Sequence, residues 1–176
     1  FEIDPAEIDK NVKVDVAGLG DAKETLEQIL PLIHENEHHE WRKEFDRKYA
    51  IEYQKVIDKD LNPTKPGLTM GEVIQEINKA TKDNAVIVTD VGQHQMIACR
   101  YARFSETKSN ITSGGLGTMG FALPAAIGAK MGAMDREVVA IIGDGGYQMT
   151  IQELGIMQQH QVPVKVVVLN NDHLGM

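Results

Sequence analysis

The sequence has little cysteine, no excess of basic residues and no long apolar run, and each shortage excludes a class of protein. Its single cysteine, Cys99, excludes an internal disulfide framework and a zinc site built on several cysteines. Lys and Arg total 18 against 26 Asp and Glu, whereas a nucleic-acid-binding protein needs a basic face. No apolar run approaches the roughly 18 residues of a membrane span. We therefore expect a cytoplasmic protein with neither nucleic-acid nor membrane partners.

The composition changes sharply near residue 60. Residues 1–60 contain 16 acidic and 9 basic residues, whereas residues 61–176 contain 10 acidic and 9 basic residues. Only two of the 16 glycines, and none of the eight methionines, precede residue 60. Two prolines and a glycine within residues 60–67 mark a boundary. We therefore expect the tail of one α/β domain, a helical connector and the start of a second domain, as a piece of a longer protein.

Two helices are predicted before this boundary. Asp21 is a typical N-cap with an acidic residue, Glu24, at the third helical position. An apolar stripe at helical spacing follows it, formed by Leu26, Ile29, Leu30 and Ile33. Residues 35–57 are highly charged, but aromatic residues recur there every four positions, at Trp41, Phe45 and Tyr49. We expect a surface helix that docks through these aromatic side chains.

Apolar segments alternate with helical segments after the boundary. Strands are predicted at residues 85–89, 138–142 and 164–169, and such continuous apolar runs are typical of a parallel sheet buried on both faces. Capping-box patterns at Thr69 and Thr150 predict one helix before the first strand and another between the last two. The expected fold class is α/β, a parallel sheet flanked by helices, incomplete in this sequence.

Polar, glycine-rich segments follow the three strands, at residues 90–95, 143–147 and 170–175. In open parallel sheets, ligands bind at the carboxyl ends of the strands. Glycines let backbone N–H groups approach a phosphate, but the carboxylate of Asp144 would repel it unless a cation lay between them. Asn171 can add an amide oxygen, and Mg²⁺ prefers such oxygen ligands. The pattern indicates a Mg²⁺-bridged diphosphate, although each residue alone is equally typical of a turn.

The spacing of these residues resembles a known cofactor motif. Gly143-Asp144-Gly145, followed after 24 residues by Asn170-Asn171, resembles the motif of thiamine diphosphate (ThDP)-dependent enzymes. Residues 91–94, 113–121, 123–128 and 169–176 resemble the large catalytic subunit of acetolactate synthase, also called acetohydroxyacid synthase. Residues 2–11 are similar to the end of that family's middle domain. The resemblance implies that residues 1–34 end an FAD-binding-like middle domain, that residues 35–66 are the connector and that residues 67–176 begin the ThDP-binding domain.

The resemblance also implies roles for particular residues. The Mg²⁺ ligands would be the side chains of Asp144 and Asn171 and the carbonyl of His173. Gly117 and Met119 would contact the pyrimidine ring of ThDP, with Met119 also the apolar prop that bends the cofactor. The other implied ThDP contacts are Val91, Gly92, Gln93, His94, Gly143, Gly145, Gly146 and Met176. The implied FAD contacts are Glu2, Ile3, Asp4, Gly114 and Gly115. Whether the protein binds FAD stays open, because some degradative members of the family lack this cofactor.

The activity that the resemblance implies is carboligation. The enzyme would decarboxylate pyruvate and join the two-carbon unit to a second 2-keto acid, giving 2-acetolactate or, from 2-ketobutyrate, 2-aceto-2-hydroxybutyrate in the biosynthesis of valine and isoleucine. The resemblance implies a homodimer or higher homo-oligomer, and the presence of a small regulatory subunit stays an open question. The family's activating glutamate lies in its N-terminal domain, so we expect no catalytic residue here and an inactive isolated chain. Glyoxylate carboligase and pyruvate oxidase are alternatives within the ThDP class.

One position departs from the family pattern. Gly146 stands where many synthases have Ser, which removes one hydroxyl from the diphosphate contacts.

Two further segments match sequence patterns of other protein families. His34, Glu35 and His38 fit the zinc-protease pattern H-E-x-x-H, within a charged connector. Residues 115–120 fit the dinucleotide pattern G-x-G-x-x-G, with Asp135 at about the right distance, but residues 109–113 before it would form a poor buried strand.

The remaining conspicuous residues have ordinary structural interpretations. We expect Cys99 to be a small buried apolar residue. His160 is expected near a helix end, where its charge suits the helix dipole. The methionines expected to fill the core are Met131, Met134, Met149 and Met157.

Overall fold

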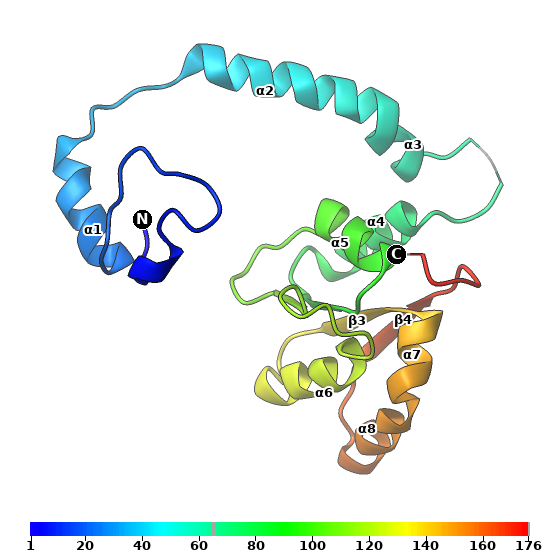
Figure 1. Ribbon diagram of the computed structural model, residues 1–176. Coiled ribbons are helices and arrows are strands. Elements are labelled where there is room, and N and C mark those ends of the chain that lie inside the picture. The colour runs from blue at the N-terminus through cyan, green and yellow to red at the C-terminus, as the bar shows by residue number, and fades with distance from the viewer. Residues whose placement is uncertain (65, 176) are drawn as a thin grey trace. The chain divides into compact units, whose positions relative to one another are not determined.

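The computed structural model describes residues 1–64 and 66–175, and its contacts divide the chain into two compact units, Phe1–Lys48 and Tyr49–Met176 (Figure 1). The domain boundaries expected at residues 34 and 66 stay predictions. Over the described ranges, no helix combines the length and the apolar character needed to cross a membrane.

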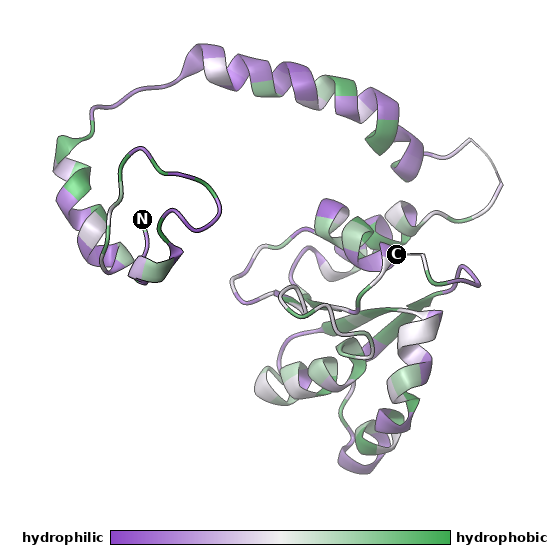
Figure 2. Cartoon of the chain, viewed as in Figure 1, coloured by the Kyte–Doolittle hydropathy of each residue, from purple (hydrophilic) through white to green (hydrophobic). Residues whose placement is uncertain are grey.

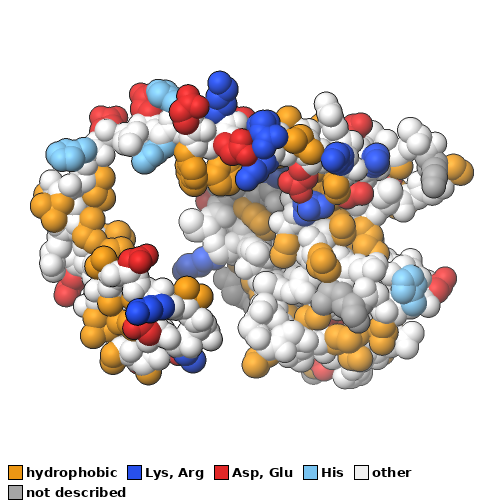
Figure 3. Space-filling view, turned by 45° about the horizontal axis from the view of Figure 1, so that its top comes forward, with side chains coloured by type: hydrophobic (Ala, Val, Ile, Leu, Met, Phe, Trp, Pro, Cys, Tyr) orange, Lys and Arg blue, Asp and Glu red, His pale blue; other side chains and the backbone are white. Residues whose placement is uncertain are grey.

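The first unit contains one α-helix of its own, α1 (Ala22–Ile29), between short 3-10 turns at Pro5–Glu7 and Leu30–Leu32. As predicted, Asp21 caps α1, because its carboxylate accepts the N–H groups of Lys23 and Glu24 at 2.9 and 3.1 Å. The apolar stripe that follows is not buried within this unit: Leu26 and Leu30 are 60% and 72% exposed. Figure 3 shows hydrophobic side chains at the surface of this part of the chain.

A long helical segment starts with α2 (His39–Glu52) and continues through a π-helical turn (Tyr53–Ile57) into α3 (Asp58–Leu61). The predicted surface helix is therefore present, and Figure 2 shows its hydrophilic character. Its expected docking through aromatic residues is wrong for the described structure. Trp41 and Phe45 are 66% and 54% exposed, and their rings instead contact each other edge-on with centroids 4.6 Å apart.

The second unit is built on a four-stranded parallel sheet with strand order β2-β1-β3-β4. The strands are β1 (Val86–Thr89), β2 (Asn110–Thr112), β3 (Val138–Gly143) and β4 (Lys165–Leu169). All four residues of β1 and all six of β3 are buried, which confirms the prediction for the apolar run of β3. The same prediction is wrong for β4, which lies at the edge of the sheet and has only partly buried and exposed residues.

Helices cover both faces of this sheet. On one face, α6 (Ala122–Gly132), α7 (Asp144–Thr150) and α8 (Leu154–His160) pack on side chains such as Val88 and Ala140. On the other face, α4 (Met70–Thr81) and α5 (Gln93–Tyr101) pack on Ile87 and Ile141. Because neighbouring residues of a strand point to opposite faces, each apolar strand contributes to both layers. The fold class predicted from the sequence is confirmed.

Of the two capping boxes predicted from the sequence, the one at Thr69 forms and the one at Thr150 does not. The Thr69 hydroxyl accepts the Glu72 N–H at 3.1 Å while the Glu72 carboxylate accepts the Thr69 N–H at 2.8 Å, which is the predicted capping box. The box predicted at Thr150 does not form. Helical structure does follow Thr150, as a 3-10 turn (Ile151–Glu153) and then α8, but an additional helix, α7, already starts at Asp144 directly after β3. The Thr150 hydroxyl caps no helix and donates to the distant carbonyl of Gly120 at 3.1 Å.

Several burial and strand predictions are also wrong. Residues Asn110–Thr112 do form a strand, β2, because an edge position needs one neighbour and little burial. Cys99 is exposed on α5 rather than buried. Of the four methionines expected in the core, only Met157 packs against it, whereas the other three are more than half exposed: Met131, Met134 and Met149. His160 ends α8 as predicted.

Candidate functional site

The strand order places a crevice at the carboxyl ends of β1 and β3. After β1 the chain leads to β2 on one side, whereas after β3 it leads to β4 on the other. Such a divergence between neighbouring parallel strands is where ligands bind in open α/β sheets. The segments that leave these strands are the glycine-rich ones selected from the sequence, residues 90–95 and 143–147.

A cavity of about 340 Å³ lies at this place, within the range of about 300–1,000 Å³ usual for small-molecule sites. The structure brings together there every predicted ThDP or Mg²⁺ contact except Met176, which lies outside the described residues. The lining comprises Met70, Val91, Gly92, Gln93, His94, Gly117, Met119, Gly143, Asp144, Gly145, Gly146, Leu169, Asn171, His173, Leu174 and Gly175. Met70, Leu169, Leu174 and Gly175 were not predicted, and no local pattern marks Met70, the first residue of α4, as a site residue.

The glycines are needed at this cavity for steric reasons. Gly92 has a φ of +152°, and a Cβ there would lie 2.6 Å from the His94 ring. A Cβ on Gly145 would lie 2.6 Å from Leu174 Cδ2. The bare backbone at these positions leaves N–H groups accessible to an anionic ligand, including those of the first turn of α5.

The predicted metal ligands come from two neighbouring strand ends. β3 and β4 pair in register up to Gly143 and Leu169, so Asp144 and Asn171 both leave the same edge of the sheet. The Asn171 amide is oriented by neighbours: its Nδ2 donates to Gln93 Oε1 at 3.2 Å, and its Oδ1 accepts the His173 N–H at 3.4 Å. A carboxylate, an amide oxygen and a backbone carbonyl are the donor types that suit Mg²⁺.

His94 contributes a buried imidazole to the wall of the cavity. The residue is 5% exposed, and its ring packs against the backbone of Gly92 and Gly143. Burial lowers the pKa of His94 from its ordinary value, although the nearby carboxylates of Asp90 and Asp144 oppose this shift. Among the described residues, none hydrogen-bonds to His94 Nε2. A neutral imidazole with one free nitrogen therefore faces this region.

The structure adds one residue that the sequence did not single out, Asp90. It is completely buried at the end of β1, and its two carboxylate oxygens accept the N–H groups of Val91 and Gly120 at 2.9 and 3.0 Å. A Cβ on Gly146 would lie 2.1 Å from Asp90 Oδ2. In this chain the Asp90 carboxylate thus occupies the space that a side chain at position 146 would require.

Five other predicted site residues are not among those that line this cavity. Glu2, Ile3 and Asp4, the implied FAD contacts, belong to the first unit, where Glu2 bridges Leu19. Gly114 and Gly115 lie in the exposed loop after β2 and do not line the cavity. Whether these residues contact FAD stays a prediction.

The zinc-protease pattern is not supported by the local structure. His34 and Glu35 lie in an irregular segment before α2, and His38 has a φ of +48°, so the two histidines do not share a helix face. Over residues 1–64 and 66–175, no cluster of three or more His, Cys, Asp and Glu side chains is suited to hold a metal ion. The proposed Mg²⁺ ligands are of another type, since only one of the three is a carboxylate.

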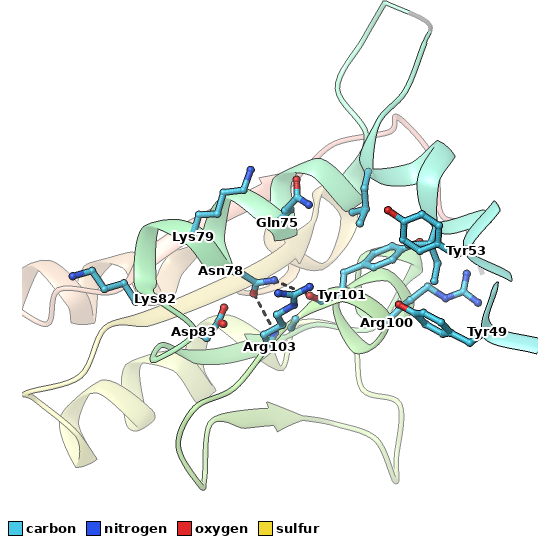
Figure 4. Close-up of a pocket in the computed structure, with 13 residues that line it drawn as sticks. Tyr49, Tyr53, Gln75, Asn78, Lys79, Lys82, Asp83, Arg100, Tyr101 and Arg103 are labelled. Carbon is cyan, nitrogen blue, oxygen red and sulfur yellow. Dashed lines mark hydrogen bonds between the residues drawn. The ribbon is translucent and has the colours of Figure 1, made fainter. Parts of the chain in front are cut away.

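A larger cavity, about 700 Å³, lies between α4, α5 and the helical segment before α3 (Figure 4). No predicted site residue lines it. Asn78, which is 7% exposed, donates to the Tyr101 carbonyl at 2.7 Å and accepts the Arg103 N–H at 3.1 Å, which joins α4 to the end of α5. Burial and a 2.6 Å hydrogen bond to Asp60 raise the pKa of Tyr101 to about 12. These contacts stabilise the unit around the cavity.

Comparison with known proteins agrees with the geometry. Residues 90–176 match the family model described as thiamine pyrophosphate enzyme, C-terminal TPP binding domain. The whole chain is 42% identical to acetolactate synthase isozyme 3 large subunit of Escherichia coli (strain K12), covering 31% of that protein. It is 40% identical over its whole length to the acetolactate synthase large subunit of Lactococcus lactis subsp. lactis (strain IL1403), covering 30% of it.

The similarity extends to a more distant organism. The probable acetolactate synthase large subunit of Methanococcus aeolicus is 37% identical over the whole chain, which covers 31% of that protein. The chain thus spans about three-tenths of the length of the relatives that it matches. Residues 90–176 therefore match the thiamine pyrophosphate enzyme family, and the relatives that align with the whole chain are acetolactate synthase large subunits.

Proposed function

We propose that the 340 Å³ cavity binds ThDP and Mg²⁺ as part of an acetolactate synthase. The observation that carries this proposal is the convergence of Asp144, Asn171 and the glycine-rich turns from separate strand ends on one cavity. Sequence spacing suggested these residues, but only folding could bring Gln93 and Asn171, 78 positions apart, into contact. The names of the relatives supply the reaction class.

The residues present fit a Mg²⁺-bound diphosphate. Asp144, Asn171 and the carbonyl of His173 would hold the metal, and the glycine backbone at positions 92, 145 and 146 would face the diphosphate oxygens. The uncharged backbone N–H groups suit the diphosphate oxygens, and the single carboxylate suits the Mg²⁺ that would accompany the diphosphate. When bound, ThDP would act as the electron sink that makes decarboxylation of a 2-keto acid feasible.

This chain's own residues would position the cofactor and shape its surroundings. Met119 lies in the cavity wall, with its Cε 3.6 Å from the place of a Cβ on Gly145, and would supply the apolar prop. His94 would present a neutral imidazole, because its pKa is lowered by burial. Fixing the cofactor in one geometry removes orientational freedom that would otherwise oppose the reaction.

The substrates and partners follow from the same proposal. Pyruvate would be decarboxylated, and the two-carbon unit would join a second pyruvate or 2-ketobutyrate, giving 2-acetolactate or 2-aceto-2-hydroxybutyrate in the cytoplasm. A homodimer or higher homo-oligomer would complete the site, and the activating glutamate would come from the family's N-terminal domain. FAD and a small regulatory subunit are proposed as further components of the whole enzyme. The isolated chain would therefore turn over no pyruvate.

The test is acetolactate formation from pyruvate by the full-length polypeptide, with ThDP and Mg²⁺, for the wild type beside Asp144→Ala. We expect product from the wild type and a loss of at least about a thousandfold in the variant, because the removed carboxylate is a metal ligand. Absence of acetolactate in the wild type would contradict the proposal. Pyruvate consumption without acetolactate would then favour another ThDP-dependent 2-keto acid enzyme.

A further inference from the structure

We propose that Asp90 and Thr150 are positioning residues that clamp Gly120 from both sides and thereby hold the Gly117–Met119 segment at the cofactor cavity. The proposal rests on the proposed function, since it assigns this segment to the pyrimidine end of ThDP. Neither Asp90 nor Thr150 lines the cavity, so both would act through the backbone of Gly120.

The first half of the clamp is the buried carboxylate of Asp90. Its Oδ2 accepts the Gly120 N–H at 3.0 Å, and its other oxygen accepts the Val91 N–H at 2.9 Å. Asp90 has no measurable exposure, and burying a carboxylate is costly unless its hydrogen bonds are made. This fully buried carboxylate binds the N–H groups of two residues that are 29 positions apart and thereby fixes the end of β1 to the end of the glycine-rich loop.

The second half is the hydroxyl of Thr150, at the end of α7. It donates to the Gly120 carbonyl at 3.1 Å, so both backbone polar groups of this one residue are held. Gly120 is buried with a φ of +80°, and its Cα faces the side chains of Met149 and Thr150 at a distance where a Cβ would lie 3.1–3.2 Å from them. The chain direction at Gly120 is therefore determined by contacts from two separate elements.

The clamp acts on Met119 because the two residues are adjacent. The other end of the loop is anchored at Ser113, whose carbonyl accepts the Gly117 N–H at 2.8 Å and whose hydroxyl accepts the Thr118 N–H at 3.1 Å. Between these anchors, Leu116 is 92% exposed and Gly117 has a φ of +64°. With Gly120 released, only the Ser113 anchor would restrain the loop, and Met119 would lose its fixed approach to Gly145.

The clamp should matter for one end of the cofactor only. The diphosphate would bind at Asp144, Asn171 and the turns after β1 and β3. Of the two clamp residues, Asp90 adjoins the turn after β1 through Val91, whereas Thr150 contacts neither turn through its hydroxyl. The pyrimidine would bind at Gly117 and Met119. Removing the Thr150 hydroxyl should therefore reduce affinity for ThDP while leaving affinity for Mg²⁺–pyrophosphate, which lacks the pyrimidine and thiazolium rings, unchanged.

The experiment uses two clamp variants of the full-length polypeptide and one matched control. Thr150→Val removes the hydroxyl and keeps the side-chain shape. Asp90→Asn keeps the shape but turns one acceptor into a donor, so that one of its two N–H partners is left unsatisfied. The control is Thr81→Val, since the Thr81 hydroxyl likewise donates to a backbone carbonyl, that of Ile77 at 2.8 Å, within α4.

Two measurements are made on each variant: the dissociation constants of ThDP and of inorganic pyrophosphate, both with Mg²⁺, and hydrogen exchange of the peptide spanning residues 115–121 without ligand. We expect each clamp variant to bind ThDP about three- to tenfold more weakly, the value of one hydrogen bond. Pyrophosphate binding should stay within about twofold in Thr150→Val and should weaken less than ThDP binding in Asp90→Asn, which also disturbs the contact with Val91. Hydrogen exchange should accelerate in both clamp variants, and Thr81→Val should change none of these quantities.

The outcomes separate this proposal from the proposed function. Unchanged ThDP affinity in both clamp variants, or equal weakening of ThDP and pyrophosphate, would overturn the positioning role. An equal effect of Thr81→Val would do the same, because it would indicate general destabilisation. A wild type that binds neither ThDP nor pyrophosphate would overturn the proposed function. In that case, unchanged hydrogen exchange of residues 115–121 in the clamp variants would also show that Asp90 and Thr150 do not restrain this segment.

Discussion

Replacing Gly146 by Ala is predicted to destabilise the protein, although the residue lies in a helix where Ala is normally favoured. Gly146 is buried in the first turn of α7, and an added Cβ would lie 2.1 Å from Asp90 Oδ2 and 2.9 Å from its Cγ. Atoms at such distances overlap, so the carboxylate would have to retreat by roughly 1 Å. It would then lose its 3.0 Å hydrogen bond from the Gly120 N–H.

The expected change in unfolding free energy follows from opposing contributions. Overpacking costs about 1–3 kcal/mol, and an unsatisfied buried N–H costs about 1–3 kcal/mol. The helical preference for Ala over Gly returns about 0.5–1 kcal/mol. Net destabilisation should therefore be about 1–5 kcal/mol, measured by differential scanning calorimetry or urea unfolding of the full-length polypeptide. The matched control is Gly128→Ala in α6, where nothing lies within 4 Å of the added Cβ, and this variant should be neutral or stabilising.

A second substitution tests whether the clash is the cause. Asp90→Ala removes the carboxylate that the new Cβ would meet, so Gly146→Ala should cost at least about 1 kcal/mol less in that background than in the wild type. Two results would refute the reasoning: stabilisation by Gly146→Ala to the same extent as by Gly128→Ala, or strict additivity of the two changes.

Three further predictions concern the rest of the second unit. Burial and the hydrogen bond to Asp60 raise the pKa of Tyr101 in the folded state to about 12, so the unfolded state loses this proton at lower pH and stability should fall between about pH 10 and pH 12. Tyr101→Phe should lose this pH dependence of stability in calorimetric scans. An identical slope of stability against pH in both proteins would contradict the prediction. Thr69→Ala should lower the unfolding free energy by about 1 kcal/mol, since it removes the capping box of α4, and an unchanged urea midpoint would argue against this. Cys99 is exposed on α5, so a thiol reagent should modify it in the native protein, whereas modification only after unfolding would show that it is buried.

The sheet and the loops at its carboxyl edge were predictable because their signals are local. The apolar runs identify β1, β3 and β4 as strands, although only β1 and β3 are fully buried, and the glycine-rich turns directly follow them. The same turns line the observed cavity, so the positions of Asp144 and Asn171 at one edge follow from strand direction alone. The edge strand β2 was missed because its short polar segment depends on pairing with β1 rather than on its own burial.

The failed predictions share a cause, which is competition from partners distant in sequence. Thr150 has the pattern of a capping box, yet its hydroxyl donates to Gly120, 30 residues earlier. Asp90 was not singled out from the sequence, because its contact with Gly120 and its proximity to Gly146 exist only in the folded chain. The exposed methionines and the exposed Cys99 show the same limit, since residue type predicts average burial and not which helix face is covered.

The most direct test of the central claim is an experimental structure of the full-length polypeptide with ThDP and Mg²⁺ bound. We expect the metal at roughly 2.0–2.1 Å from oxygens of Asp144, Asn171 and His173, the usual Mg²⁺–oxygen distance, with the diphosphate against the glycine-rich turns after β1 and β3. A cofactor bound elsewhere, or a metal without Asp144 among its ligands, would contradict the assignment of this cavity as the ThDP site.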